Sequence, residues 1–453
     1  MSRILLRYKA LGMMLAVLLI VSSCRKDDNN VVDTTNQLSQ FQASSAWVWN
    51  EMFLEVERYA DGYRPGPAPR ALGYMGLSAF EACQPGMADD YNSIAHLYPE
   101  LQLPLIEADQ EYHWPTVVNG SYAYLMKRYF PHVAADLKFK IHQLESRLDE
   151  EALNRIPREV FTRSKQRGEA VARAIFEWSG TDPIGHNAFL NARPASYIPP
   201  SGTGLWQPTY PDYGRGMFPH WGRARTFAIT EADKLCRPPL PISEQAGSAL
   251  WNQAKQVYDL NTPTLAFEEQ WIAEFWSDDD LNLTFSPPSR WVAVADQVID
   301  HEDASLDLAL YTYLKVGLAL NDVGVAAWHS KYYYNIERPV SYLRRVMDPN
   351  WEPHHPYTPS FPAYPSGHAS FGAAAAEVLN DIYGNNYAMI DRCHESRTDF
   401  LGMPRSFNSF NEMAEENAYS RLPLGVHFLM DATSGVELGH SVGAKINQLR
   451  IKK

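Results

Sequence analysis

The chain of 453 residues is long enough for two or three ordinary domains, or for one large helical domain. Hydrophobic residues make up 45% of it and charged residues 21%, which excludes a disordered, collagen-like or coiled-coil chain. Asp and Glu number 53 against 40 Lys and Arg, and the formal net charge of -13 argues against nucleic acid as a partner.

Residues 1–23 have the pattern of a signal peptide. Three basic residues lie among the first nine, and residues 10–21 form an apolar run too short for an ordinary membrane-spanning helix. The run ends in Val-Ser-Ser-Cys at Cys24, which resembles the lipobox of bacterial lipoproteins, in which the cysteine is lipidated. A plain signal peptide followed by an incidental cysteine is the alternative.

Residues 24–40 combine this cysteine with a segment rich in Asp, Asn and Thr, which predicts a flexible tether. We therefore expect a lipid anchor at Cys24 that holds the chain at a bacterial cell envelope, with the body in the periplasm or outside. Arg25 is not the aspartate that often retains lipoproteins at the inner membrane, which favours the outer membrane. Nothing in the sequence specifies the oligomeric state.

The body, residues 41–453, is predicted to be a single large all-α domain of packed helical bundles, because strand signals are sparse. Residues 45–59 show helical spacing of apolar positions, and Gly73 and Gly76 would allow a second helix, residues 70–83, to pack closely. Further helices are predicted within residues 117–178, 243–260, 303–331 and 369–379.

A segment of different texture, residues 191–241, is dominated by Pro, Gly, Tyr and Trp and shows no periodicity. Such a long ordered loop is typical of a cover over a functional site. The three cysteines of the body, Cys83, Cys236 and Cys393, lack the spacing of a zinc site. They are compatible with one disulfide and one thiol, or with three free thiols.

Three motifs lie in the bundle predicted for about residues 303–450. The first places Lys331 seven residues before Arg338, which precedes a proline. Seven residues are about two helical turns, so both cations would point the same way if the helix persists to the proline.

The second motif is Ser366-Gly367-His368, followed by an alanine-rich stretch of high helix propensity. A serine and a glycine at a helix start offer a hydroxyl, free backbone N–H groups and the positive end of the helix dipole, which together can bind an anion. His368 beside them is placed to move protons.

The third motif combines Arg421, His427 and Asp431. The spacing of four residues predicts that the carboxylate and the imidazole share one helix face, where Asp431 can hold the tautomer that leaves the other ring nitrogen free. Three cations, a hydroxyl, backbone amides and two histidines suit a tetrahedral or trigonal-bipyramidal oxyanion. One imidazole would bond to its central atom, and the other would exchange protons.

The sequence of these motifs, K-x6-RP, PSGH and SR-x5-H-x3-D, resembles the signature of the superfamily that joins vanadium-dependent haloperoxidases with type 2 phosphatidic acid phosphatases and bacterial acid phosphatases. The resemblance implies the helical-bundle fold of vanadium chloroperoxidase and acid phosphatase. The flanking sequence is similar to the bacterial haloperoxidase-like branch, in which Trp328 and Phe361 would line a halide pocket. An ordinary core role is the alternative for these two aromatics.

The resemblance also implies roles for the motif residues. Oxygens of vanadate or phosphate would be bound by Lys331, Arg338, Ser366, the N–H of Gly367 and Arg421. His427 would be the ligand of vanadium, or the nucleophile that forms a phosphohistidine, with Asp431 orienting it. His368 would be the acid or base.

Two activities follow from the resemblance. The first is a vanadate-dependent haloperoxidase, an oxidoreductase that oxidises halide with hydrogen peroxide. The alternative is an acid phosphatase that hydrolyses a phosphomonoester, since phosphate can occupy the same site. A surface lipoprotein that binds an oxyanion without catalysis is a third interpretation.

Overall fold

The structure, a computed structural model, describes residues 38–261, 264–278, 282–354 and 357–453. The predicted signal peptide, Cys24 and the tether up to residue 37 lie outside the described residues. The last three residues assigned to the tether, Leu38–Gln40, form a short 3-10 helix instead, and the side chain of Leu38 is fully buried. The folded body therefore starts slightly earlier than predicted.

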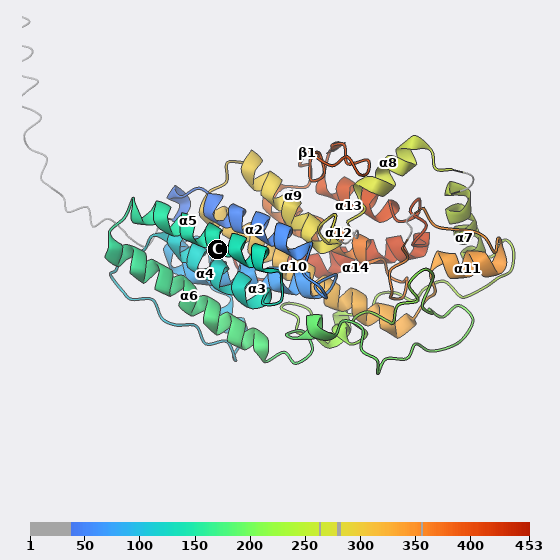
Figure 1. The fold of residues 1–453 in the computed structure, drawn as a ribbon, viewed down its shortest axis with the longest axis horizontal. Coiled ribbons are helices and arrows are strands. Elements are labelled where there is room, and N and C mark those ends of the chain that lie inside the picture. The colour runs from blue at the N-terminus through green and yellow to red at the C-terminus, as the bar shows by residue number, and fades with distance from the viewer. Residues whose placement is uncertain (1–37, 262–263, 279–281, 355–356) are drawn as a thin grey trace, which may run out of the picture.

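Thirteen α-helices dominate the described residues, which confirms the all-α prediction (Figure 1). They are α2 Ser44–Glu57, α3 Pro67–Cys83, α4 Trp114–Tyr129, α5 Ala135–Leu153, α6 Arg158–Gly180, α7 Ala249–Leu260, α8 Phe267–Phe275, α9 Pro287–His301, α10 Leu306–Tyr334, α11 Pro339–Val346, α12 Gly367–Tyr383, α13 Phe410–Tyr419 and α14 Leu429–Asn447. Short 3-10 helices are η1 Leu38–Gln40, η2 Gln84–Met87, η3 Ala95–Leu97, η4 Ala188–Asn191, η5 Trp221–Arg223 and η6 Glu231–Asp233. Strands β1 Met389–Asp391 and β2 Arg405–Phe407 form a small antiparallel sheet.

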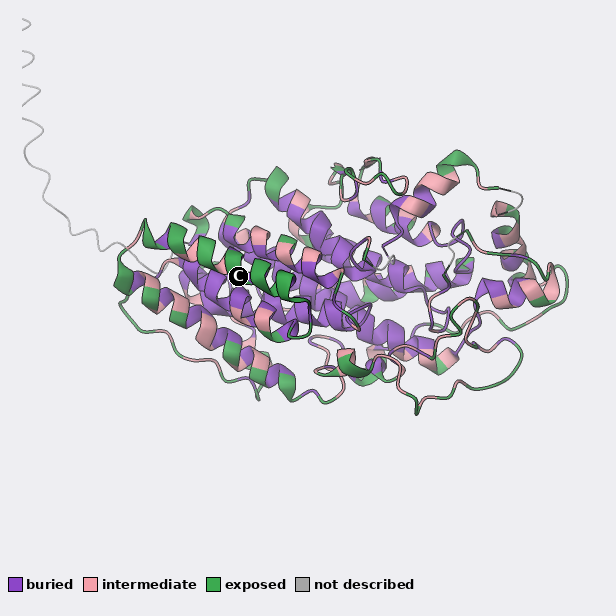
Figure 2. Cartoon of the chain, in the orientation of Figure 1, coloured by how far each residue is buried: buried purple, intermediate pink, exposed green. Residues whose placement is uncertain are grey.

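Helix α10 runs through the middle of the molecule and joins two groups of helices (Figure 1). On one side it packs against α3, which continues into the group formed by α2 and α4–α6. On the other side it packs against α12 and α14, which also contact α13. Helix α10 is buried along most of its length (Figure 2) and forms the centre of the core, with a few buried polar and charged residues, such as Asp322 and Lys331, among its apolar ones.

Close packing of α3 against α10 depends on small residues, as predicted. A Cβ atom added to Gly76 would lie 2.8 Å from the backbone oxygen of Tyr313, and one added to Gly317 would lie 2.8 Å from that of Leu72. Real Cβ atoms do not approach that closely, so glycine at these positions sets the separation of the two helices.

Some helix bounds differ from the predicted ones for local reasons. Helix α3 begins at Pro67, three residues early, because proline is tolerated in the first turn, where no backbone N–H needs an acceptor. Helix α7 begins at Ala249 rather than near residue 243, because the side chain of Ser248 caps it by accepting from the backbone N–H of Trp251.

The long loop of residues 191–241 is ordered and irregular, as predicted, and it covers the C-terminal half of α10. The side chain of Trp206 is fully buried, and its backbone N–H donates to the carbonyl of Asn335 at 2.7 Å. From inside α10, the carboxylate of Asp322 accepts three backbone N–H groups of the loop, at 2.7 to 3.1 Å.

Two further sequence questions are answered by the described residues. Cys83, Cys236 and Cys393 are free thiols rather than partners in a disulfide. Among the helices that the structure describes, none is both long and apolar enough to cross a membrane.

Candidate active site

The first motif does not lie on one continuous helix, because a helix end separates its two cations. Helix α10 ends at Tyr334, because Asn335 adopts a left-handed conformation with φ of 50°. Arg338 is the extended N-cap residue of α11, as expected for a residue before proline. The condition that the helix persists from Lys331 to the proline is therefore not met, and tertiary contacts place both cations at the site.

Lys331 and Arg338 are fully buried and hold the loop that leads to the second motif. The ammonium group of Lys331 donates to the carbonyls of Pro362 and Ala363, at 3.0 and 2.9 Å. The Arg338 Nε–H donates to the carbonyl of Phe361 at 3.0 Å. These bonds fix the positions of the two charges relative to the loop.

The second motif forms the helix start that the sequence predicted. Ser366 is the N-cap of α12, and its Oγ accepts from the backbone N–H of Ala369 at 3.4 Å. Gly367 is the first residue of the helix, where backbone N–H groups have no partner within the helix. The backbone N–H of Ser366 donates to the carbonyl of Asp431 at 2.9 Å, which joins the second motif to the third.

In the third motif, His427 lies before α14 and not on it, which corrects the expectation of a shared helix face. The N-cap residue is Phe428, and Asp431 in the first turn reaches back towards the start of the helix. Its Oδ2 accepts from the backbone N–H of Phe428 at 2.9 Å and lies 3.0 Å from Nδ1 of His427. The spacing of four residues thus works through a helix cap.

The protonation of His427 follows from its partners. Nη1 of Arg338 lies 3.1 Å from Nε2 of His427, and a guanidinium group can only donate. Nε2 therefore accepts, and the ring proton sits on Nδ1, where it is donated to Asp431. Burial, together with the charges of Arg338, Lys331 and other nearby groups, holds the pKa of His427 well below its usual value. The imidazole is neutral at neutral pH, with a lone pair on Nε2.

The carboxyl of Asp431 has no contact with solvent. Burial raises its pKa to about 7, although the N–H of Phe428 and the charges of Lys331 and Arg338 act in the opposite direction. The main structural role of the Asp431 carboxyl group is to orient the His427 ring.

Arg421 joins the third motif to His368. Its Nη1 donates to Nε2 of His368 at 3.0 Å, and its Nη2 donates to the carbonyl of Trp276 at 2.6 Å. Both side chains are more than nine-tenths buried. The same reasoning as for His427 places the proton of a neutral His368 on Nδ1.

A small pocket opens beside these groups. The predicted residues that line it are Trp328, Phe361, Gly367, His368, Arg421 and His427. The rings of Trp328 and Phe361 lie 5.0 Å apart, and the indole N–H of Trp328 donates to the carbonyl of Met217 in the long loop at 3.3 Å. Lys331, Arg338, Ser366 and Asp431 are buried and do not line the pocket. Arg338 bonds to Phe361, Val426 and His427 of the lining, and Asp431 bonds to His427.

Sequence reasoning missed five residues of the pocket wall: Pro65, Pro287, Pro359, Phe371 and Val426. Phe371 lies one turn after Gly367 in α12, and Val426 is adjacent to His427. Their positions in the sequence, close to motif residues, could therefore have indicated that they lie in the pocket wall. The prolines come from segments far apart in the sequence, and no motif indicated them.

The donor set defines a class of site. Three cations lie close to two histidines, a hydroxyl and a helix N-terminus. Cationic side chains, a hydroxyl and the N–H groups of a helix start all donate to anion oxygens, so the residues fit a compact, highly charged oxyanion such as vanadate or phosphate. The lone pair on Nε2 of His427 could bond to the central atom of that oxyanion. These residues thus form a candidate oxyanion site on an α-helical scaffold, with a histidine whose Nε2 could form a covalent or coordinate bond.

Comparisons with known proteins agree with this class. Residues 311–451 match the family of the VCPO second helical-bundle domain. The vanadium chloroperoxidase of Curvularia inaequalis is 27% identical over a region that covers 36% of this chain and 36% of that protein's length. The chain therefore spans about a third of this curated relative.

Solved structures extend the likeness to most of the chain. The first bacterial vanadium-dependent iodoperoxidase matches 91% of this chain and 97% of its own with a TM-score of 0.81 and 26% identity. A holo-form bacterial vanadium-dependent chloroperoxidase, at 15% identity, shares the fold over 95% of this chain and 96% of its own with a TM-score of 0.63. Over most of its length the chain therefore has a fold similar to that of bacterial vanadium-dependent haloperoxidases.

Proposed function

We propose that the protein is a vanadate-dependent haloperoxidase that oxidises halide with hydrogen peroxide. The observation that carries the proposal is the neutral His427, whose Nε2 lone pair lies among three buried cations at the wall of an apolar pocket. The likeness to known proteins supports the same activity, because the similar proteins are named as vanadium-dependent chloroperoxidases and an iodoperoxidase.

Vanadate would be held by the side chains of Lys331, Arg338 and Arg421, by Ser366 and the N–H of Gly367, and by Nε2 of His427. When bound, it supplies a Lewis-acidic centre that activates hydrogen peroxide towards halide. Arg338 donates to Nε2 of His427 and so keeps the ring proton on Nδ1; the Nε2 lone pair could bond to vanadate once this guanidinium donates to an anion oxygen instead. Asp431 holds the ring plane in place.

His368 would exchange protons with hydrogen peroxide at the pocket wall. Its imidazole is in place there because Arg421 donates to Nε2. Trp328, Phe361 and the prolines give the pocket an apolar wall, which would exclude water from a reactive oxidised halogen. We propose that the two aromatics bound the halide site.

Phosphate presents oxygens of the same kind to the same donors, so it should compete with vanadate. No feature of the described residues favours phosphomonoester hydrolysis over halide oxidation, and phosphate is expected as an inhibitor of vanadate loading.

The test is halogenation of an activated dione or a phenolic dye by the purified full chain, with hydrogen peroxide and bromide, before and after addition of vanadate. Activity should appear only with vanadate and should be lost in His427→Ala. The matched control is His440→Ala, which removes a histidine of α14 that pairs with Glu377 instead. Phosphate release from an aryl phosphate without any halogenation would overturn the proposal in favour of the phosphatase.

We also propose that the protein is lipid-anchored through Cys24 to a bacterial envelope membrane, preferably the outer one. The support is the lipobox-like sequence and the polar segment after it. In a bacterial host, metabolic labelling with a fatty acid should mark the full chain and not Cys24→Ser. Equal labelling of both chains, or of neither, would contradict the anchor.

A further inference from the structure

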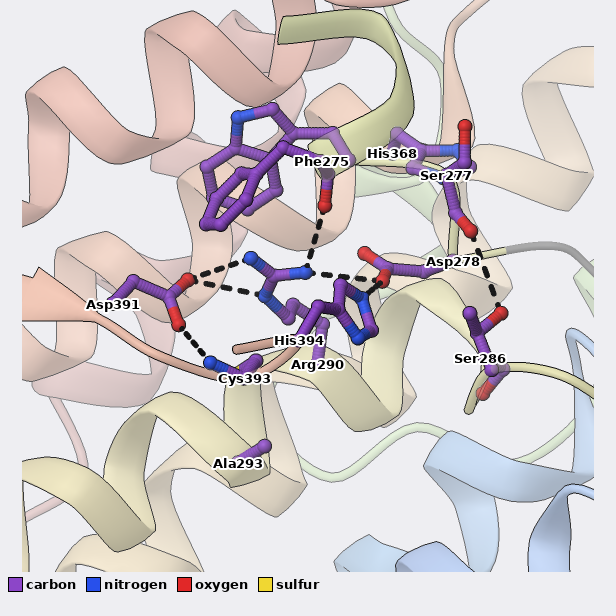
Figure 3. Close-up of polar contacts among 12 residues, drawn as sticks. Phe275, Ser277, Asp278, Ser286, Arg290, Ala293, His368, Asp391, Cys393 and His394 are labelled. Atoms are coloured by element: carbon purple, nitrogen blue, oxygen red, sulfur yellow. Dashed lines mark hydrogen bonds and ion pairs between the residues drawn. The ribbon is translucent and has the colours of Figure 1, made fainter. Parts of the chain in front are cut away.

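A buried ion-pair network lies next to the site but outside the three motifs (Figure 3). At its centre is Arg290 of α9, whose Nη2 lies 2.7 Å from Oδ2 of Asp391. Its Nη1 lies 3.1 Å from Oδ1 of Asp278, which is also 2.8 Å from Nε2 of His394. All four side chains are at least 98% buried.

Arg290 holds one short segment, Phe275–Asp278, at several points. Nη1 donates to the carbonyl of Phe275 at 3.1 Å as well as to the carboxylate of Asp278. The guanidinium carbon lies 4.5 Å from the ring centroids of both Phe275 and Trp276, which is within cation–π distance. A carbonyl, two rings and a carboxylate of the same segment therefore contact one side chain.

That segment reaches the oxyanion site through Trp276. Helix α8 ends at Phe275, so the Trp276 carbonyl lies where helical hydrogen bonding stops. The carbonyl accepts from Nη2 of Arg421 at 2.6 Å, while Nη1 of Arg421 donates to His368. The direction of the Arg421 guanidinium thus depends on the position of an irregular stretch of backbone.

We propose that Arg290 is a positioning residue of the oxyanion site. It fixes the Trp276 carbonyl, and this carbonyl orients Arg421 towards both the bound oxyanion and His368. The first turn of the same helix contributes Pro287 to the pocket wall, so α9 sets the pocket shape and the direction of Arg421 together. The inference rests on the oxyanion chemistry of the proposed function and not on the oxidation of halide.

The test compares Arg290→Lys with the unaltered full chain. Lysine keeps the charge but cannot bond to two carboxylates and a carbonyl at once. Isothermal titration with inorganic phosphate, and separately with orthovanadate, should give a Kd about tenfold weaker, as expected when one charge-assisted hydrogen bond to the anion is misdirected. The 15N resonances of the His368 ring should shift as well, since Arg421 no longer donates to Nε2 in the same geometry.

The matched control is Arg70→Lys. Arg70 is also buried, and its Nε lies 3.3 Å from Oδ2 of Asp182, but this pair belongs to the other group of helices. Both variants should lose thermal stability, and only Arg290→Lys should lose oxyanion affinity and shift the His368 resonances.

A second variant covers the case in which Arg290→Lys does not fold. Asp391→Asn keeps the shape of the acceptor and leaves Arg290 bonded to Asp278 and Phe275, so about threefold weaker phosphate binding is expected. An unaltered Kd with unaltered His368 resonances, in whichever variant folds, would overturn the positioning role. If the unaltered full chain binds both phosphate and orthovanadate but oxidises no halide, the proposed function is refuted. The positioning role of Arg290 is not affected by that result.

Discussion

The packing of α14 on α12 sets the relative positions of the second and third motifs, which lie at the starts of these two helices. The substitution Gly439→Ala perturbs this packing directly. A Cβ atom at Gly439 would lie 2.5 Å from the backbone oxygen of Ser370 and 2.6 Å from the Cβ of Ala373. Neither neighbour is the end of a flexible side chain, so the helices themselves must separate. Overpacking of this kind costs about 2–3 kcal/mol, and the helix propensity of alanine returns about 1 kcal/mol. A net loss of about 1–2 kcal/mol in the free energy of unfolding follows from these two terms.

The second expected effect is functional. The backbone bond from Ser366 to Asp431 lies at the N-terminal ends of the same two helices, so their separation should weaken phosphate binding severalfold. Denaturant unfolding and phosphate titration measure the two effects. The control is Gly180→Ala at the end of α6, where the nearest atom to a new Cβ is 3.7 Å away, and its stability should not fall. If Gly439→Ala were as stable as Gly180→Ala, the argument from close helix approach would be refuted.

Three further predictions concern the site. Arg338→Lys should weaken orthovanadate binding by about 10- to 100-fold in equilibrium titration. The reason is that one ammonium group cannot bond to Phe361, Val426 and His427 together. A change in Kd below about threefold would contradict this reasoning. The ring of His427 should stay neutral in nitrogen NMR spectra of the ligand-free chain from pH 8 to pH 6, and titration near its ordinary pKa of about 6.5 would refute the assignment. Because the folded-state pKa is lowered, His427 contributes stability that is present above about pH 6.5 and is lost as the pH falls towards the folded value. Trp328→Phe should change the KM for halide in steady-state assays while leaving the Kd for phosphate within about twofold. The reason is that the indole N–H donates to Met217 and does not bond to the oxyanion donors. Equal effects on both constants would contradict a role of this ring in the halide site alone.

Much of the architecture was already contained in local sequence patterns. Helical spacing of apolar residues predicted the all-α fold, and the Ser-Gly pair predicted the start of α12 with its anion-binding end. Capping and propensity act over a few residues, so they can be recognised without knowledge of the partners. The three motifs could be recognised for the same reason, since each is a short continuous pattern.

The relations between the motifs were decided by tertiary structure. The sequence predicted a shared helix face for His427 and Asp431, whereas a helix cap joins them. Lys331 and Arg338 are separated by a helix end at Asn335, and both bond to the loop at residues 361–363. Arg290 had no local signal at all, because its partners Asp278 and Asp391 lie 12 and 101 residues away. Periodicity encodes which face of an element is buried, but it does not encode which other element covers that face. Only the packed chain brings such distant groups within hydrogen-bond distance, and the direction of each charge in the site depends on those contacts.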